Sequence, residues 1–325
     1  GRVVPLEKKG GGIRPLVVGE SLRNLVATCW LGRVGARMEE KLQPRHIGLG
    51  RLTGVENAVH RAKLATPHLR PDEAAIKIDF ANAYNTVDRR AMVEAVNGRC
   101  PELAGWASWT LGCRAILAGD GQVECTTGVQ QGDPLSPLVF SITMAEIAAV
   151  LEVHFQSRGN PLEQQWYLDD GLFILKKDDV PELFNVLHAA AGTLGLSLNR
   201  AKSEILGFGD LSSLAAATGA PALNNKYDWT YLGCPLSYAS TQHPAFLAAV
   251  ERHKKLEARI GMVDDPQAQL ALRRPCMGAC RILHLTATCP GIETAHITEE
   301  VAAGMRRGLD IITSTKASDT AYSQA

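Results

Sequence analysis

The sequence has no Cys-x-x-Cys pair, although its 325 residues include 8 cysteines. Scattered cysteines argue against a disulfide framework and predict a reducing compartment. No segment shows the charged, apolar and small-residue order of a signal peptide. The longest mostly apolar stretch, residues 138–151, is too short to cross a bilayer and carries Glu146. We therefore expect an intracellular protein with no membrane partner.

Net charge is also absent, because 34 Lys and Arg balance 34 Asp and Glu. The charges are unevenly spread: residues 1–70 hold 13 basic and 5 acidic side chains, residues 71–235 hold 11 and 20, and residues 236–325 hold 10 and 9. A basic region beside an acidic region suits a protein that holds phosphate with one part and divalent metal with another. Solvated surface charge of no consequence explains the same pattern equally well.

The composition, 46% hydrophobic and 21% charged, is that of a globular chain long enough for about two domains. Strands and helices alternate up to about Pro235, and residues 74–79 have the pattern of a short strand that ends on Asp79. Beyond residue 236 the periodicity is helical only, notably over residues 246–260 and 268–284. These patterns predict one domain over residues 1–235 and a helical one over 236–325.

Two sites on different strand ends carry the candidate chemistry. Asp169 and Asp170 stand between two apolar arms, which is typical of a tight hairpin with both carboxylates at its tip. If this hairpin neighbours the strand of Asp79, the three carboxylates converge. Hard divalent cations prefer oxygen ligands, and a pair of them activates an attacking hydroxyl and stabilises a leaving oxygen in phosphoryl transfer. The arrangement therefore indicates nucleotidyl transfer.

Several motifs occur in a defined order along residues 13–233. They are the segment Asp79-Phe80-Ala81-Asn82-Ala83-Tyr84 and its continuation to Arg89, the loop of residues 128–137, Tyr167-Leu168-Asp169-Asp170, residues 195–202, and Tyr231-Leu232-Gly233. Together they resemble the reverse transcriptases, most closely those of non-LTR (target-primed) retrotransposons, with group II intron maturases and telomerase as more distant relatives. The resemblance implies an α+β right-hand polymerase: fingers interleaved with a palm of antiparallel sheet backed by helices, then a helical thumb.

The same resemblance implies RNA-directed DNA synthesis, with an RNA template, a DNA primer and dNTPs as partners. Asp79 and Asp169 would ligate two Mg²⁺ ions, or Mn²⁺ in their place, with Asp170 as a third carboxylate and the Phe80 carbonyl nearby. Lys202 would protonate the leaving pyrophosphate, although a solvated lysine explains its presence almost as well.

Further residues match nucleotide and primer contacts of the family. Tyr84 matches an aromatic that excludes ribonucleotides by a clash at the 2′ position, the alternative being a core aromatic. The other nucleotide contacts implied are Arg14, Lys9 and, beside it, Lys8 in the fingers, and Gln131 and Gly132 in the loop. The implied primer grip is Tyr231, Leu232 and Gly233.

Two positions depart from the family pattern: Leu168, and Asn85 where Asp is common. Neither departure removes a metal ligand. An RNA-templated RNA polymerase and a catalytically silent, nucleic-acid-binding retroelement remnant stay open as alternatives. Nuclear action is an expectation from the resemblance alone.

Overall fold

The computed structural model describes residues 2–7, 13–49, 53–112, 115–118, 121–160, 162–236, 243–278, 282–289, 291–316 and 318. These residues form two compact units, one of residues 1–58 and 68–224 and the other of residues 59–67 and 225–325. The chain thus divides at Asn224 and Asn225, and the domain boundary near Pro235 stays a prediction.

A five-stranded sheet lies at the centre of the first unit. Its strand order is β6-β7-β3-β8-β9, and every pairing is antiparallel except that of β8 with β9. The strands are β3 (Glu73–Ile78), β6 (Glu163–Tyr167), β7 (Asp170–Lys176), β8 (Glu204–Gly207) and β9 (Ala222–Leu223). Ala74, Ala75 and Ile76 of β3 have no exposed surface, so this central strand is covered on both faces. The expected palm is confirmed, with one parallel pairing at its edge.

A second sheet, in the order β2-β1-β4-β5, belongs to the same unit. It contains β1 (Arg2–Glu7), β2 (Ile13–Val18), β4 (Ala115–Ala118) and β5 (Gly121–Glu124). β1 and β2 pair antiparallel from Arg2 opposite Val18 to Glu7 opposite Ile13. The three consecutive glycines between them, residues 10–12, lie outside the described residues.

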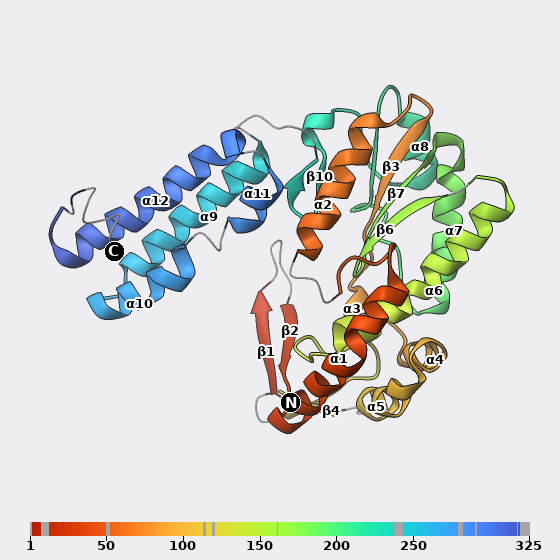
Figure 1. The fold of residues 1–325 in the computed structure, drawn as a ribbon, viewed down its shortest axis with the longest axis horizontal. Helices are drawn as coiled ribbons and strands as arrows, with labels where there is room; N and C mark the ends of the chain where they lie inside the picture. The colour runs from red at the N-terminus through yellow and green to blue at the C-terminus, as the bar shows by residue number, and fades with distance from the viewer. Residues whose placement is uncertain are drawn as a thin grey trace. The chain divides into compact units, whose positions relative to one another are not determined.

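Helices cover the five-stranded sheet and supply much of the core. The helical segments are α1 (Ser21–Leu42), α3 (Ala83–Thr86), α4 (Arg89–Arg99), α5 (Pro101–Gly112), α6 (Ser136–Ser157), η2 (Lys177–Asp179), α7 (Val180–Thr193) and α8 (Ser212–Thr218), while α2 (Gly54–Ala65) and η1 (Thr66–His68) run across the unit boundary. α6 and α7 pack together on one side of the sheet (Figure 1), and the Gln164 side chain in β6 donates to the Ala148 carbonyl in α6 at 2.9 Å. Pro137 stands in the first turn of α6, where its missing N–H is not needed for a hydrogen bond.

α6 has the length and composition of a membrane span, with a mean hydropathy of 1.7. In the structure 67% of this apolar window is buried inside the protein. Its side chains Phe140, Ile142 and Met144 have no exposed surface and belong to the core of the first unit. Core burial therefore accounts for the composition of α6.

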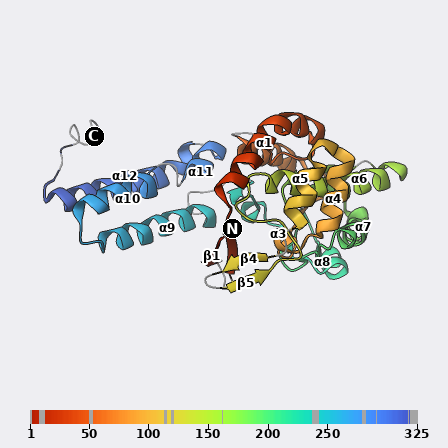
Figure 2. The ribbon, with the colours of Figure 1, turned by 90° about the horizontal axis from the view of Figure 1, so that it is seen from below.

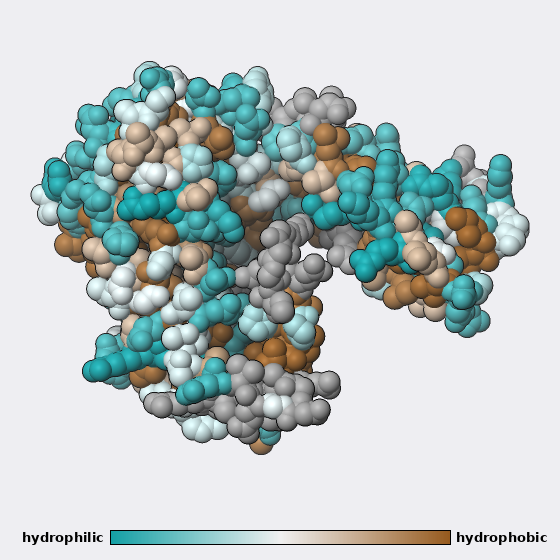
Figure 3. All heavy atoms as spheres, turned by 180° about the vertical axis from the view of Figure 1, so that it is seen from behind, coloured by the Kyte–Doolittle hydropathy of each residue, from teal (hydrophilic) through white to brown (hydrophobic). Residues whose placement is uncertain are grey.

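Among the described residues of the second unit, the elements are helical apart from one small hairpin. Its elements are η3 (Lys226–Asp228), β10 (Thr230–Tyr231), β11 (Cys234–Pro235), α9 (Pro244–Gly261), α10 (Pro266–Met277), α11 (Leu283–Thr288) and α12 (Gly291–Thr313), together with the end of α2. α9, α10 and α12 lie side by side in both ribbon views (Figures 1 and 2). Hydrophobic side chains gather in small patches among hydrophilic ones on the face in Figure 3, and the exposed apolar residues of this unit include Leu247, Met262 and Leu270.

The prediction of one helix over residues 268–284 is wrong. α10 ends at Met277, because Gly278 adopts extended backbone (φ −70°, ψ 178°), and the next helix begins at Leu283. Pro275 inside α10 already lacks the N–H that would continue the hydrogen-bond ladder. Periodicity alone does not register such a break.

Candidate active site

The strand register brings the three predicted carboxylates to one end of the palm sheet. β3 and β7 pair so that Ile78 lies opposite Gly171, and continuing this antiparallel register by one residue puts Asp79 opposite Asp170. Residues directly opposite in such a pair have Cα atoms about 4.5–5.5 Å apart. Asp169 is the second residue of the turn between β6 and β7, next to Asp170. Residues 90 positions apart in the chain thus share one sheet end.

The turn between β6 and β7 is unusually constrained. Tyr167 pairs with Asp170, so only Leu168 and Asp169 connect the strands, and Leu168 has a φ of +56°. A branched residue with positive φ costs conformational energy of order 1–3 kcal/mol, and such residues cluster at functional sites. The amide of Ile47 donates to the Trp166 carbonyl at 2.9 Å, and the amide of Trp166 donates to the Arg45 carbonyl at 2.7 Å. The segment before the turn is therefore held on a second side.

Asp79 is fixed by the segment that follows α7. Its carbonyl accepts from the Asn199 amide at 2.8 Å, and its amide donates to Ser203 Oγ at 3.2 Å. Burial raises the pKa of Asp79, opposed by the charge of Lys202 and a hydrogen bond from the Asn199 side chain. The exposed Lys202 therefore lies within electrostatic reach of Asp79.

Mutual repulsion is clearest at Asp170. Burial, then the charges of Asp169 and Asp79, raise the pKa of Asp170 to about 7, while the charge of Lys77 lowers it. Across the described residues, no three His, Cys, Asp or Glu side chains converge closely enough to hold an ion by themselves. Mg²⁺ is commonly held by one or two carboxylates completed by water and substrate phosphates. The donor set therefore fits a cation that arrives with its phosphate-bearing substrate.

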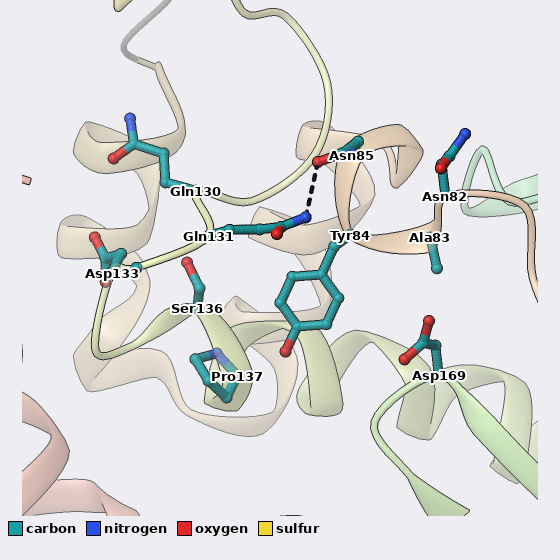
Figure 4. Close-up of a pocket in the computed structure, with 11 residues that line it drawn as sticks. Asn82, Ala83, Tyr84, Asn85, Gln130, Gln131, Asp133, Ser136, Pro137 and Asp169 are labelled. Carbon is teal, nitrogen blue, oxygen red and sulfur yellow. Dashed lines mark hydrogen bonds between the residues drawn. The ribbon is translucent and has the colours of Figure 1, made fainter. Parts of the chain in front are cut away.

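Beside the carboxylates lies a cavity of about 500 Å³ (Figure 4). It is lined by Asn82, Ala83, Tyr84, Asn85, Gln130, Gln131, Gly132, Asp133, Ser136, Pro137 and Asp169. The Tyr84 ring and the Asp169 carboxylate both point into it, from α3 and from the hairpin respectively (Figure 4). The structure thus brings the predicted residues Asp169, Tyr84, Gln131 and Gly132 around one space.

Tyr84 forms one wall of this cavity. Its ring stacks on Phe140 of α6, with ring centroids 4.5 Å apart. Burial, followed by the charge of Asp169, raises the pKa of the Tyr84 hydroxyl, so the ring is neutral across the physiological range. A neutral aromatic held by packing is a rigid steric element beside the carboxylates.

The loop that carries Gln131 is tied to the segment after Asp79. Gln131 Nε2 donates to Asn85 Oδ1 at 3.3 Å, drawn as the dashed line in Figure 4. The amide of Val129 donates to the Tyr84 carbonyl at 2.8 Å. Gly128 has a φ of +71°, and a Cβ there would stand 2.5 Å from the Tyr84 carbonyl oxygen. Only glycine allows this close approach.

The other side of the loop is tied to α1 and β2. The Val17 amide donates to the Gln131 carbonyl at 2.7 Å. Arg23 of α1 pairs with the buried carboxylate of Asp133 at 2.9 Å. Residues 110 positions apart make this pair, and no local sequence signal announces it. The Gln131 loop is thus held from two sides.

Arg89 ends the motif that begins at Asp79, but the sequence did not reveal its role. Its guanidinium is buried and donates to the carbonyls of Gly128 (2.9 Å), Leu111 (3.0 Å) and Cys125. It stands at the start of α4, ten residues after Asp79, so it joins that segment to the beginning of the Gln131 loop. The only signal in the sequence is an arginine in an otherwise ordinary helix start.

The remaining predicted residues lie elsewhere. The Phe80 ring is buried against Trp166. The predicted metal contact of Phe80 would therefore come from its backbone carbonyl. Arg14 is described by its backbone alone, which pairs with Leu6, and Lys8 and Lys9 lie outside the described residues. Tyr231, Leu232 and Gly233 belong to the second unit.

The predicted primer grip forms a two-residue hairpin in that unit. Tyr231 pairs with Cys234, and both connecting residues have positive φ, 48° at Leu232 and 78° at Gly233. Positive φ at both positions is the type I′ pattern, which matches the twist of the strands. The Tyr231 side chain is buried, and the role in primer binding stays a prediction.

The chain is similar to a known protein family over most of its length. The family described as reverse transcriptase (RNA-dependent DNA polymerase) matches residues 6–236. The retrotransposable element SLACS 132 kDa protein of Trypanosoma brucei gambiense is 28% identical over 214 residues, which cover 62% of this chain and 17% of that protein. The chain therefore spans about a sixth of this relative's length.

Solved structures show the fold. Apo telomerase from Candida tropicalis superposes with a TM-score of 0.51 and 10% identity, covering 97% of this chain and 58% of that one. The RNA-dependent RNA polymerase of a human picorbirnavirus gives a TM-score of 0.49 and 12% identity, covering 96% and 64%. The similarity to the telomerase structure confirms the right-hand polymerase fold expected from the sequence.

Proposed function

Because this chain belongs to the reverse transcriptase (RNA-dependent DNA polymerase) family, we propose that it extends a DNA primer on an RNA template. The resemblance to reverse transcriptases of the non-LTR retrotransposon type is confirmed by the family match and by the retrotransposable-element relative. In the proposed reaction the primer 3′ hydroxyl loses its proton and attacks the α-phosphate of a dNTP. The bond to the β-phosphate breaks, and pyrophosphate leaves.

The register of β3 with β7, which ends with Ile78 opposite Gly171 and so brings Asp79 next to Asp170, with Asp169 at the adjoining turn, is the observation that carries this proposal. Divalent metal use is general in the family. Asp79, Asp169, Asp170 and the Phe80 carbonyl are the groups that would hold two Mg²⁺ ions. The ions would supply Lewis-acid activation of the attacking oxygen and charge stabilisation at the leaving oxygen.

The chain's own side chains account for the choice of nucleotide. Tyr84 projects into the cavity beside Asp169, where its packed ring would clash with a ribose 2′ hydroxyl. Gln131, held by Asn85, would lie against the incoming nucleotide and the template base. Lys202 lies near Asp79 on an exposed loop, where it would give a proton to the departing pyrophosphate.

The alternative, RNA-templated RNA synthesis, needs the same carboxylates but a site that tolerates a 2′ hydroxyl. The position of Tyr84 favours dNTPs. RNA and DNA would be bound mainly through their phosphates, so binding would tolerate sequence and weaken with salt.

Primer extension tests the proposal. The parent chain, given Mg²⁺, an RNA template and a DNA primer, is expected to incorporate dNTPs and to discriminate against rNTPs. Asp169→Asn should abolish extension, because it removes a ligand charge without changing the shape of the turn. Asp178→Asn is the matched control, since Asp178 is exposed and belongs to another Asp pair. Equal extension by the parent and the Asp169→Asn variant would refute the assignment, and preferential use of rNTPs would favour the alternative.

A further inference from the structure

The second unit contains a cavity of about 670 Å³ that the proposed reaction does not use. All of its lining residues belong to that unit: His60, Lys63, Leu64, Thr66, Pro67, Lys226, Tyr227, Trp229, Leu236, Ala287, Thr288 and Cys289. Ligand sites typically enclose about 300–1,000 Å³ and combine apolar walls with a few polar groups. The cavity is thus large enough for one nucleotide.

Hydrogen bonds join two of its walls. Lys63 Nζ donates to the Thr288 carbonyl at 2.7 Å, and His60 Nε2 lies 3.1 Å from the Ala287 carbonyl oxygen. Both carbonyls are at the end of α11, where a helix leaves acceptors without intrahelical partners. The end of α2 and the end of α11 are therefore fixed against each other, and the cavity between them is preformed.

The lining is cationic and aromatic. Lys63 and Lys226 line it from separate segments, and none of the lining residues is Asp or Glu. Tyr227 is 55% exposed, and Lys226 Nζ lies 5.5 Å from the centroid of its ring. Trp229 is buried beneath the surface and lines the same space. An occupant that matches this lining is anionic and has a flat ring.

We propose that this cavity binds one unpaired nucleotide of a single-stranded nucleic acid, with the base stacked on Tyr227 and an adjacent phosphate held by Lys63 and Lys226. Stacking on an exposed aromatic beside basic side chains is how proteins hold single strands without reading sequence. An acidic peptide would also satisfy the lysines but would leave the Tyr227 ring without a flat partner. The choice of nucleic acid rests on the proposed function, which makes an RNA template the strand at hand.

Binding of a short labelled single-stranded RNA, measured by fluorescence anisotropy without dNTPs or Mg²⁺, tests the site. Tyr227→Leu is expected to weaken binding about 5- to 150-fold, the loss of one base stack, because stacking is worth about 1–3 kcal/mol per base. Lys226→Gln should reduce the slope of log affinity against log salt by about 0.7, the value for one phosphate contact on a single strand. Lys255→Gln, at an exposed position of α9 away from the cavity lining, is the matched control and should change less.

Crosslinking locates the contact. RNA that carries a photoreactive uridine should crosslink to the peptide that contains Lys226 and Tyr227 in the parent, and not in Tyr227→Leu. Asp169→Asn should bind and crosslink like the parent, so a failed polymerase assay would leave this result intact. If Tyr227→Leu and Lys226→Gln bind like Lys255→Gln, or if the crosslinks fall elsewhere, the cavity is not a nucleotide site.

Discussion

Removing the guanidinium of Arg89 is expected to loosen the Gln131 loop and lower stability together. In Arg89→Met the carbonyls of Gly128, Leu111 and Cys125 lose their charged donor while the site stays buried. One hydrogen bond to a charged group contributes about 1.5–3 kcal/mol, and bonds that share a donor group are not additive. We therefore expect the free energy of unfolding to fall by about 3–5 kcal/mol, less than the sum of three such bonds.

Thermal unfolding measures this loss. At about 2–4 °C per kcal/mol for a domain of this size, the Tm of Arg89→Met should fall by roughly 6–20 °C. Arg89→Lys keeps the charge but offers fewer donors, so its Tm should lie between those of Arg89→Met and the parent. Arg89→Lys should also raise the KM for dNTPs more than it lowers kcat, because in this variant the loop that carries Gln131 is less ordered before the nucleotide binds.

The neighbouring residue provides the control. The Arg90 side chain is 88% exposed. Within the described residues, Glu94 is its ion-pair partner. Arg90→Met should change the Tm by no more than an exposed ion pair is worth, about 0.3–0.5 kcal/mol. Equal Tm values for Arg89→Met and Arg90→Met would refute the reasoning about the loop.

Three other predictions concern the same site. Because the pKa of Asp170 is raised to about 7, its contribution to stability is complete below the unfolded pKa near 4 and is lost as pH rises through 7. The Tm of the metal-free protein should therefore fall from pH 5 to pH 8, Mg²⁺ should raise the Tm more at pH 8 than at pH 5, and Asp170→Asn should flatten the pH profile. A parent Tm that stays constant over this window would contradict the shift. Tyr84→Ala should reduce discrimination between dNTPs and rNTPs in primer extension by about 10-fold or more, and unchanged discrimination would mean that Tyr84 only fills the core. Gly128→Ala should cost about 1–3 kcal/mol of stability in urea unfolding, because the added Cβ meets the Tyr84 carbonyl at positive φ. The control Gly98→Ala, which places its Cβ in open space within α4, should be neutral or stabilising, and equal effects of the two changes would contradict the close approach.

Local patterns were enough to predict the parts of the site that depend on short stretches of chain. The strand that ends on Asp79 and the hairpin around Asp169 and Asp170 each follow from spacing or turn chemistry within about ten residues. The motifs then indicated the family, because their order along the chain matches it as well as their residues.

Contacts between distant segments could not be predicted in this way. Arg89 bonds to carbonyls 22 and 36 residues away, and Arg23 pairs with Asp133 across 110 residues. Each looks like an ordinary helix arginine until the fold is known, because backbone carbonyl acceptors leave no trace in residue identity and no local pattern links Arg23 to Asp133. The cavity beside Tyr227 was likewise invisible, since its walls come from residues 60–67, 226–236 and 287–289.

Counting bound ions tests most directly whether Asp79, Asp169 and Asp170 share divalent metal. Mn²⁺ binding can be measured by electron paramagnetic resonance on the complex of the protein with an RNA template, a chain-terminated DNA primer and the next dNTP. We expect two Mn²⁺ ions with a spin coupling that reports their proximity, and loss of the coupled pair in both Asp79→Asn and Asp169→Asn. An unchanged pair of coupled ions in either variant would contradict the shared site.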